Sequence, residues 1–318
     1  MATVSGQGTT FNLPNYTGLL FNVAPQDTPL LTAIGGLAGG VPCTAREFEW
    51  QTEGLESSSA NNSKVEGAPA PTASEVSRAN VSNVCEIHYE SVEISYTKLA
   101  AVGQLDGINT ADGFNPVQDE LSHQLSLKLK KMAIDVEMSF QAGTYAKPAT
   151  NATARTTRGM LNVPTTNVFA NGGTARALSK AIIDQALSDM YLNGSPLHEG
   201  TTVLWVHPKT KIKLTDLYTT ATLNQPTMTR NIGGVAVDTL VTDSGVFGIK
   251  ASRYMPQGEI LISDLSVLRP RFLRLDDGSM MKMEELGRTG ASKKWDIYFE
   301  IGLEYGPEVY HGIIADLS

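Results

Sequence analysis

The stretch NPVQDELSHQLSLKLKKMAIDVEMSFQAG, residues 115–143, predicts one long amphipathic helix. Asn115 followed by Pro116 is a helix-start signal, and Gly143 is a plausible stop. The apolar side chains between them recur at steps of four and three: Val117, Leu121, Leu125, Leu129, Met132, Val136 and Phe140. At ~100° and ~1.5 Å per residue they share an arc of roughly 140° on a helix about 40 Å long. We therefore expect a beam-like helix, longer than a compact domain normally requires.

Two strand-like stretches precede this helix. Val41–Thr52 alternates and carries aromatic residues, and Val84–Leu99 alternates again, so we expect these two stretches to pair. Between them, Glu53–Ser82 is rich in Ser, Ala, Asn, Glu and Pro. A connection of ~30 residues without a core of its own is rare inside a compact domain. We interpret it as a projecting arm.

The N-terminal 45 residues contain a single charged residue, Asp27. A free tail is expected to be polar and charged, because a segment with little to bury stays disordered. Apolar side chains are instead spread among prolines and glycines: Phe11, Leu13, Tyr16, Leu19, Leu20, Phe21, Leu30, Leu31 and Ile34. Such an arm is expected to lie along another surface, either of its own domain or of a neighbouring copy.

The chain beyond the long helix predicts a small α/β unit followed by strands. Thr174 is expected to cap a second helix that closes at Asn193-Gly194, and Thr201–His207 and Pro208–Tyr218 predict a buried strand and a short helix. Asp277-Gly278 is a two-residue hairpin signal. The further predicted strands are Val235–Val241, Val246–Ser252, Glu259–Asp264, Val267–Leu275, Met280–Leu286 and Lys294–Leu303.

The composition argues against several classes of protein. A net charge of -8 opposes a face that neutralises nucleic-acid phosphates, and the densest basic stretch (Lys128, Lys130, Lys131) is interpreted as a solvated helix face. Apolar runs fall short of the ~20 residues that span a membrane. Two cysteines are too few for a disulfide framework, and no secretory signal opens the chain, so synthesis in a reducing compartment is expected.

No motif points to catalysis, a cofactor or a metal. The glycine pairs lack the lysine or the spacing of a phosphate-binding loop. The histidines never stand at i, i+4, and no Cys or carboxylate completes a metal-ligand spacing around them: His88, His123, His198, His207 and His311. Cys43 and Cys85 could face each other across the sheet and are interpreted as small buried thiols, with His88 on the opposite face from Cys85. We expect no catalytic, cofactor-binding or metal-binding residue.

The order of these parts resembles the HK97-like fold of tailed-phage major capsid proteins. NLPNYTGLLFNVAPQDTPLLTAIGG at residues 12–36, followed by Phe48-Glu-Trp50, is similar to the opening of the SU10-type major head protein family, and Arg155–Met160 and Tyr254–Arg274 are further matches. The resemblance implies an α+β fold with five parts: an N-terminal arm (1–40), an extended β-hairpin loop on a strand pair (41–100, projecting part 53–82), a peripheral domain (101–160) with spine helix 115–142, an α/β axial domain (161–265) and return strands (266–318).

The same resemblance implies a major capsid protein that assembles itself, as hexamers and pentamers, into the icosahedral shell enclosing the double-stranded DNA of a tailed bacteriophage. The chain would be made in the host bacterial cytoplasm and reside in the virion capsid. Portal, scaffold or decoration proteins are expected partners, and DNA would be enclosed without sequence-specific binding. Some relatives carry a long helical N-terminal scaffolding segment. Met1–Phe11 leaves no room for one, so a separate scaffold, or none, is expected.

We expect neighbouring subunits to order the arm and the loop. The predicted contact residues are Phe11, Leu13, Tyr16, Leu19, Leu20, Phe21, Leu30 and Leu31 in the arm, and Leu55, Lys64, Val65 and Val76 in the loop. Crosslinking between a loop lysine and a neighbour's asparagine occurs in one branch of this fold, and Lys64 is the only lysine in this loop. An ordinary exposed lysine is the default interpretation. A ladder of multimers in denaturing electrophoresis of particles would distinguish the two.

Two other functions remain as alternatives. A secreted or surface structural protein, such as an adhesin or a surface-layer protein, would suit a neutral surface rich in Thr and Asn, although the missing signal peptide counts against it. An enzyme assembled from residues distant in sequence would require a deep pocket with convergent titratable groups.

Overall fold

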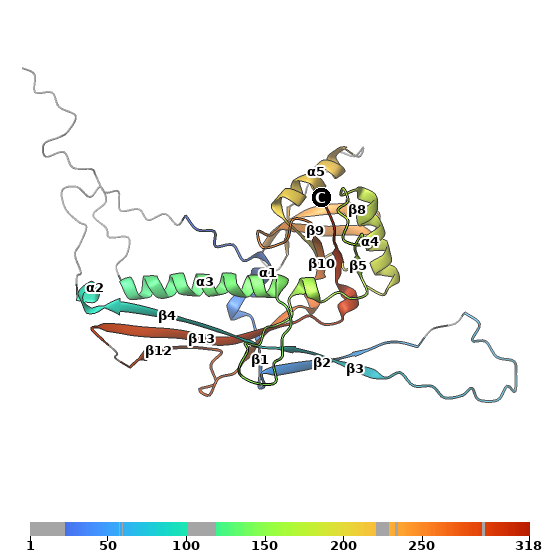
Figure 1. Ribbon diagram of the computed structural model, residues 1–318. Helices are drawn as coiled ribbons and strands as arrows, with labels where there is room; N and C mark the ends of the chain where they lie inside the picture. The colour runs from blue at the N-terminus through green and yellow to red at the C-terminus, as the bar shows by residue number, and fades with distance from the viewer. Residues whose placement is uncertain are drawn as a thin grey trace, which may run out of the picture. The chain divides into compact units, whose positions relative to one another are not determined.

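The computed structural model describes residues 23–56, 58, 60–100, 119–220, 229–232, 235–287 and 290–318 (Figure 1). The described helices are α1 (Pro29–Ala33), α2 (Tyr96–Ala100), α3 (Glu120–Ala142), α4 (Lys180–Leu192) and α5 (Pro208–Thr220). The strands before α4 are β1 (Val41–Cys43), β2 (Glu47–Glu53), β3 (Arg78–Val84), β4 (Glu86–Ser95) and β5 (Val168–Phe169). Those after it are β6 (Thr202–Val206), β7 (Thr229–Ile232), β8 (Val235–Thr242), β9 (Gly245–Ala251), β10 (Ile260–Asp264), β11 (Arg269–Leu273), β12 (Met281–Leu286), β13 (Ser292–Glu304) and β14 (Gly312–Ile314).

The chain divides into two compact units. Unit 1 comprises Met1–Asp27, Tyr89–Ile134 and Lys282–Tyr298, and unit 2 comprises Thr28–His88, Asp135–Met281 and Phe299–Ser318. The division falls inside α3, β4 and β13, each of which contributes residues to both units. The five-part division expected from the resemblance stays a prediction.

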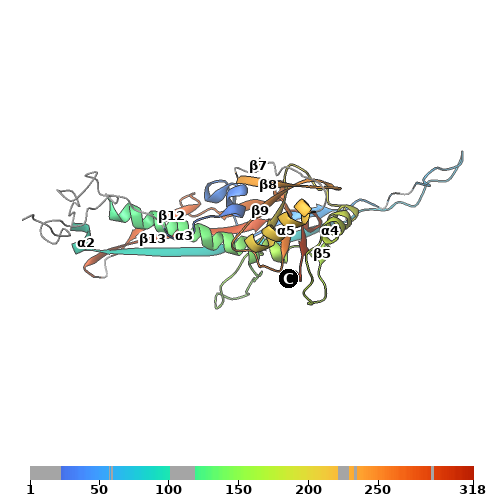
Figure 2. The ribbon, with the colours of Figure 1, turned by 90° about the horizontal axis from the view of Figure 1, so that it is seen from above.

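A seven-stranded sheet forms the core of unit 2, with the order β5-β14-β10-β6-β9-β8-β7. All five residues of β6 are buried, and this strand lies between antiparallel β10 and parallel β9. Its continuous apolar run predicted this position, because a strand covered on both faces needs no polar face. Figures 1 and 2 show α4 and α5 beside the sheet. Side chains from both helices and the strands form one apolar cluster, including Ile183, Leu187, Leu214, Phe247, Ile260 and Ile262.

A second sheet has the order β1-β11-β13-β12, and β4 also pairs with β13. The predicted Asp277-Gly278 turn forms, with Gly278 at a φ of 82° and the Leu275 N–H donating to the Ser279 carbonyl at 2.9 Å. The predicted hairpin is wrong, however, because β11 and β12 each pair with β13 instead of with each other. A local turn signal does not specify which strands pair across it.

The predicted pairing of Val41–Thr52 with Val84–Leu99 is also wrong. The first stretch forms two strands, of which β1 pairs in parallel with β11 while β2 pairs antiparallel with β3. β3 starts at Arg78, inside the stretch predicted to project, and β4 pairs with β13. The segment that leaves the strands is therefore residues 54–77, named here the β2–β3 loop. In Figure 1 this pale blue segment runs well past the ends of β2 and β3.

The long helix α3 begins after Asp119, whose carboxylate accepts the N–H groups of Leu121 and Ser122, each at 3.2 Å. Such a cap satisfies donors that the first helical turn leaves unpaired. The predicted start at Asn115-Pro116 lies outside the described residues. The predicted end is confirmed, because α3 closes at Ala142, directly before Gly143.

The second predicted helix starts later than expected. α4 begins at Lys180, so the predicted cap at Thr174 is wrong, although the close at Asn193-Gly194 is confirmed. The intervening chain is held in extended pairing with the C-terminus: the Arg176 N–H donates to the Asp316 carbonyl at 2.8 Å, and the Ser318 N–H donates back to the Arg176 carbonyl at 2.9 Å. A partner distant in sequence here outweighs a local helix-start signal.

Ion pairs link α3 and β4 within unit 1. The Glu90 carboxylate accepts hydrogen bonds from Lys128, at 2.8 Å, and from Lys131. These two ammonium groups lower the pKa of Glu90 from its usual value. Two of the three lysines in the basic stretch are thus neutralised within the subunit. Over the described part of the chain, no helix combines the length and the apolar character needed to cross a bilayer.

Candidate functional site

The β2–β3 loop is the most exposed part of unit 2 that the sequence singled out. All of its described residues except Ala68 are exposed. Leu55 and Val65 have exposed fractions of 93% and 80%, and Val76 has 44%. Lys64 lies among them and is exposed as well. The predicted loop contacts are thus all accessible to another molecule.

The predicted arm contacts divide into two groups. Those outside the described residues are Phe11, Leu13, Tyr16, Leu19, Leu20 and Phe21. Leu30 and Leu31 are described, and their exposed fractions are 0% and 1% within the chain's own fold. Of the two surfaces that the arm could cover, these two residues pack against their own subunit, which leaves them almost no exposed surface for a neighbouring one.

A buried carboxylate on α3 fixes this end of the arm. Glu137 is fully buried and accepts the N–H of Leu30 at 3.0 Å and the N–H of Leu31 at 2.7 Å. Gln141, one turn later on α3, also donates to it. These N–H groups open the short helix α1 and lack partners within it, so the carboxylate supplies acceptors to buried donors that would otherwise be unpaired. Glu137 therefore anchors α1 to α3 within unit 2.

The base of the β2–β3 hairpin is held by a buried asparagine. Asn83 on β3 has no exposed surface, and its amide nitrogen donates to the carbonyls of Leu303, at 2.7 Å, and Arg158, at 3.4 Å. Its amide oxygen accepts the N–H groups of Arg158 and Val84, each at 2.9 Å. One side chain thus joins β3, β13 and the segment around Arg158.

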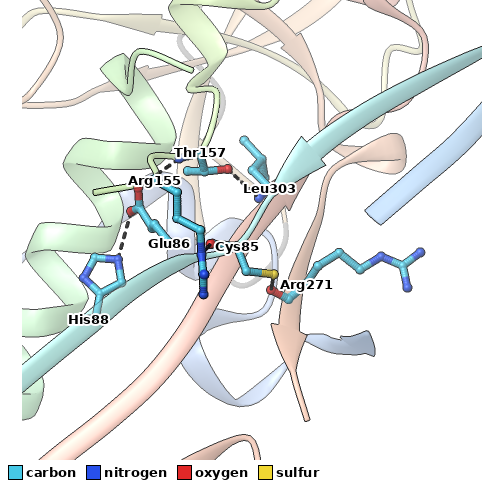
Figure 3. Close-up of polar contacts among 7 residues, drawn as sticks. All are labelled: Cys85, Glu86, His88, Arg155, Thr157, Arg271 and Leu303. Carbon is cyan, nitrogen blue, oxygen red and sulfur yellow. Dashed lines mark hydrogen bonds and ion pairs between the residues drawn. The ribbon is translucent and has the colours of Figure 1, made fainter. Parts of the chain in front are cut away.

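Figure 3 shows the neighbouring polar contacts around Cys85, Glu86, His88, Arg155 and Thr157. Glu86 Oε2 accepts the Thr157 N–H at 3.1 Å, and its Oε1 accepts a hydrogen bond from His88 Nε2 at 2.9 Å. Arg155 Nε donates to the Cys85 carbonyl at 2.6 Å. These contacts pin the segment after α3 to the junction of β3 and β4, where the hairpin begins.

Arg155 also donates through Nη2 to Glu300 on β13. The exposed fractions of the two side chains are 21% and 8%, so the pair is largely withdrawn from solvent. Arg155–Met160 is one of the stretches that carry the family resemblance. Its residues act in the structure as a polar lock between the hairpin base and β13.

Sequence reasoning missed the buried polar residues Asn83, Glu86 and Glu137. Their types are usually exposed, and their partners lie far along the chain. Glu137 gave one weak signal: it stands next to Val136 at the edge of the apolar arc of α3. No comparable signal marks Asn83 or Glu86.

The two cysteines face each other as expected, but from different elements. Cys43 ends β1 and Cys85 lies between β3 and β4, with the two Sγ atoms 3.5 Å apart and both thiols free. Cys85 is buried, whereas Cys43 is partly exposed, so the expectation of two buried thiols holds for one of them. His88 stacks on Phe299, with ring centroids 5.3 Å apart. In the described ranges, no group of three or more His, Cys, Asp or Glu side chains could hold a metal ion.

A buried histidine stabilises the C-terminal part of unit 2. His311 Nε2 donates to the Tyr305 carbonyl at 2.7 Å, and its Nδ1 accepts the Asp264 N–H at 3.3 Å. Complete burial lowers the pKa of His311 from 6.5 to about 4. The neutral ring is therefore the form that fits this site.

This histidine should make the subunit sensitive to mild acid. Below pH 6.5 the His311 side chain of the unfolded chain binds a proton, whereas in the folded chain it stays neutral down to about pH 4. The free energy of unfolding should therefore fall by about 3 kcal/mol as the pH is lowered across that window. Unfolding free energies measured at several pH values should show this loss in the native chain and a smaller loss in His311→Gln, whose side chain does not titrate. Equal slopes in the two proteins would contradict the assignment.

The chain matches the SU10 major capsid protein family over residues 3–318. No curated protein sequence matches it.

Solved structures share its fold at low identity. The capsid asymmetric unit of cyanophage A-1(L) aligns with a TM-score of 0.67 and 11% identity, covering 98% of each chain. The capsid of a native GTA particle aligns with a TM-score of 0.61 and 12% identity, covering 100% of this chain and 99% of the other. The SrpI encapsulin of Synechococcus elongatus PCC 7942 aligns with 0.57 and 12%, covering 87% and 84%. The fold alone does not separate a phage capsid from an encapsulin, whereas the family match does.

Proposed function

This chain belongs to the SU10 major capsid protein family, and from that membership we propose that its copies join as hexamers and pentamers into an icosahedral head around double-stranded DNA. It is the major capsid protein of a tailed bacteriophage, a structural protein and not an enzyme. The expected HK97-like α+β fold is confirmed by the capsid structures that align with it. The adhesin, surface-layer and enzyme alternatives are set aside on the same ground.

The exposure of the β2–β3 loop is the observation that carries our proposal for how the subunits join. Leu55 and Val65 are almost fully exposed on a segment whose described residues are nearly all exposed. In an assembled capsid, each subunit is surrounded by copies of itself. We assign this loop, with Leu55, Lys64, Val65 and Val76, to contacts with neighbouring subunits.

The free-energy cost of ordering the loop indicates what kind of contact it must make. Fixing the backbone of one residue costs roughly 1 to 2 kcal/mol, whereas full burial of a Leu or Val side chain returns about 1.5 to 3 kcal/mol. Three apolar side chains therefore cannot order residues 54–77 alone. Backbone hydrogen bonds to a neighbour must contribute, as when an extended segment adds to the edge of a sheet. Each contact can stay weak, because a closed lattice repeats it many times.

Arm residues 11–21 are proposed as a second contact, tethered through α1 to Glu137. The hydrogen bonds from Leu30 and Leu31 support this, since they hold one end of the arm to its own subunit. Lys64 is proposed as an ordinary contact residue of the loop.

Further partners are proposed from the needs of a DNA-filled head. Portal, scaffold or decoration proteins would each meet the shell formed by this chain. The net charge of -8 supports enclosure of DNA without sequence-specific binding, because a phosphate-binding face needs clustered Lys and Arg.

Electron microscopy of the purified chain tests this proposal. Expressed alone and concentrated, the protein should give closed shells, or at least ring-shaped hexamers and pentamers. Light scattering on the same sample measures the mass of the assemblies. A single monodisperse monomer at all concentrations would contradict self-assembly.

A further inference from the structure

The two cysteines meet where the arm joins the fold and where the β2–β3 hairpin leaves it. Cys43 ends β1, the strand that follows α1. Cys85 lies at the junction of β3 and β4, and both residues belong to unit 2. The Sγ atoms are 3.5 Å apart, with no residue between them. A disulfide between them would therefore link the strand that follows the arm to the base of the β2–β3 hairpin.

The two sulfur atoms differ in their access to solvent. Cys43 is partly exposed and lines a hollow of about 260 Å³, together with Pro42, Arg271 and Glu304. Cys85 is buried, and its Sγ also lies 3.8 Å from the Arg271 carbonyl (Figure 3). A small reagent in the hollow would reach the sulfur of Cys43 first.

The pKa values of the two thiols also favour Cys43 as the more reactive sulfur. A hydrogen bond from the Cys85 thiol lowers the pKa of Cys43 to about 7. Partial burial opposes this shift, and the Arg271 guanidinium adds to it. The same hydrogen bond, together with burial and the negative charge of Glu300, raises the pKa of Cys85. A thiolate is the reactive form of cysteine. Of the two thiols, Cys43 is therefore the one that loses its proton first.

We propose that Cys43 and Cys85 form an intrachain disulfide by exchange with a small-molecule disulfide such as oxidised glutathione, with Cys43 as nucleophile and Cys85 as resolving cysteine. In the first step the Cys43 thiolate attacks one sulfur of glutathione disulfide, forms a mixed disulfide and releases one glutathione thiolate. In the second step Cys85 gives its proton to that thiolate, attacks Cys43 Sγ and releases the second glutathione. Two protein thiols are oxidised and one small disulfide is reduced to two thiols.

The second step becomes easier once the first has occurred. The leading cause of the raised pKa of Cys85 is its hydrogen bond to Cys43, and this interaction is lost when Cys43 enters the mixed disulfide. The sulfur atoms must then approach by roughly 1.5 Å to reach the bond length of a disulfide. Arg155, which donates to the Cys85 carbonyl at 2.6 Å, holds the backbone of Cys85 in place during the exchange.

The consequence for the particle rests on the proposed function. A reducing cytoplasm would keep the thiols free while shells assemble, and the oxidising conditions after release from the host would close the bond. The covalent ring closed by the disulfide would contain the whole β2–β3 hairpin. The unfolded chain would be restricted, and the subunit would resist unfolding in the finished head.

Mass spectrometry of the full-length chain tests the exchange directly. The reduced protein is incubated with oxidised glutathione, alkylated, digested with trypsin and measured without reduction. Because Arg46, Lys64 and Arg78 lie between the two cysteines, trypsin separates their peptides unless a disulfide joins them. We expect one linked pair containing Cys43 and Cys85, and a rise in unfolding temperature of about 5 °C that dithiothreitol reverses. Glutathione adducts without the linked pair, links between chains or no reaction would each overturn the proposal.

Two single variants test the roles. Cys85→Ser keeps a hydrogen-bond donor beside Cys43 and should accumulate a stable glutathione adduct at Cys43. Cys43→Ser should stay unmodified, because its remaining thiol is buried. Modification of Cys43→Ser at the rate of Cys85→Ser would overturn the assignment of the nucleophile. Since the readout is a covalent bond within one chain, its failure is distinct from a failure of shell assembly.

Discussion

Deletion of Glu56–Ser77 should abolish shell formation and leave the subunit folded. The deletion removes most of the β2–β3 loop but preserves the paired residues Glu53 and Arg78 at the ends of β2 and β3. Gly54 and Leu55 then connect the strands as a two-residue hairpin turn, for which glycine in the first position is favourable. We expect a cooperative unfolding transition close to that of the native chain. Electron microscopy of the same preparation should show no closed shells.

A second variant separates the loop's side chains from its length. Replacing residues 56–77 by a Gly/Ser segment of equal length keeps the spacing and removes Val65 and Val76. This variant should also fail to form shells, because flexible Gly/Ser chains bury little and lose much entropy when ordered. Intact heads from the deletion variant would refute the lattice role of the loop.

Arg155→Ala should destabilise the subunit by about 3 to 5 kcal/mol, the usual range when one partner of a buried ion pair is removed. The substitution leaves the buried carboxylate of Glu300 without its arginine and the Cys85 carbonyl without its donor at 2.6 Å. Chemical denaturation of the assembly-blocked deletion variant, with and without Arg155→Ala, measures this difference on subunits alone.

Arg158→Ala provides the matched control. Arg158 belongs to the same segment, but its guanidinium lies over the Tyr145 ring at 4.9 Å, and its contacts with Asn83 are made through backbone atoms that the substitution keeps. A loss of about 1 kcal/mol or less is expected. Equal losses for the two arginines would show that the polar lock contributes nothing specific.

The elements that the sequence predicted are those with strong local patterns. The apolar arc of α3 and the apolar run of β6 depend only on neighbouring residues. β6 formed where expected, and the described α3, Glu120–Ala142, lies within the predicted helix and ends where expected. β3 was missed because Arg78–Val84 is polar and becomes a strand by pairing with β2. The start of α4 was misplaced because Arg176 pairs with the C-terminal residues of the chain.

The residues of the candidate site likewise fall into those that the sequence predicted and those that it did not. Exposure of Leu55, Lys64 and Val65 followed from a loop too poor in apolar residues to bury itself. The polar residues that hold the hairpin base could not be predicted, because Asn83 is satisfied by groups at Arg158 and Leu303. Polar side chains are buried only where such partners meet them, and these partners are distant in sequence.

Hydrogen exchange at the β2–β3 loop tests most directly whether neighbouring subunits order it. Backbone amides of residues 54–77 are compared between assembled particles and dissociated subunits, with the buried strand Thr202–Val206 as an internal reference. We predict that the reference stays protected in both samples, while the loop amides exchange rapidly in subunits and at least tenfold more slowly in particles. Equal exchange of the loop in the two samples would contradict the account.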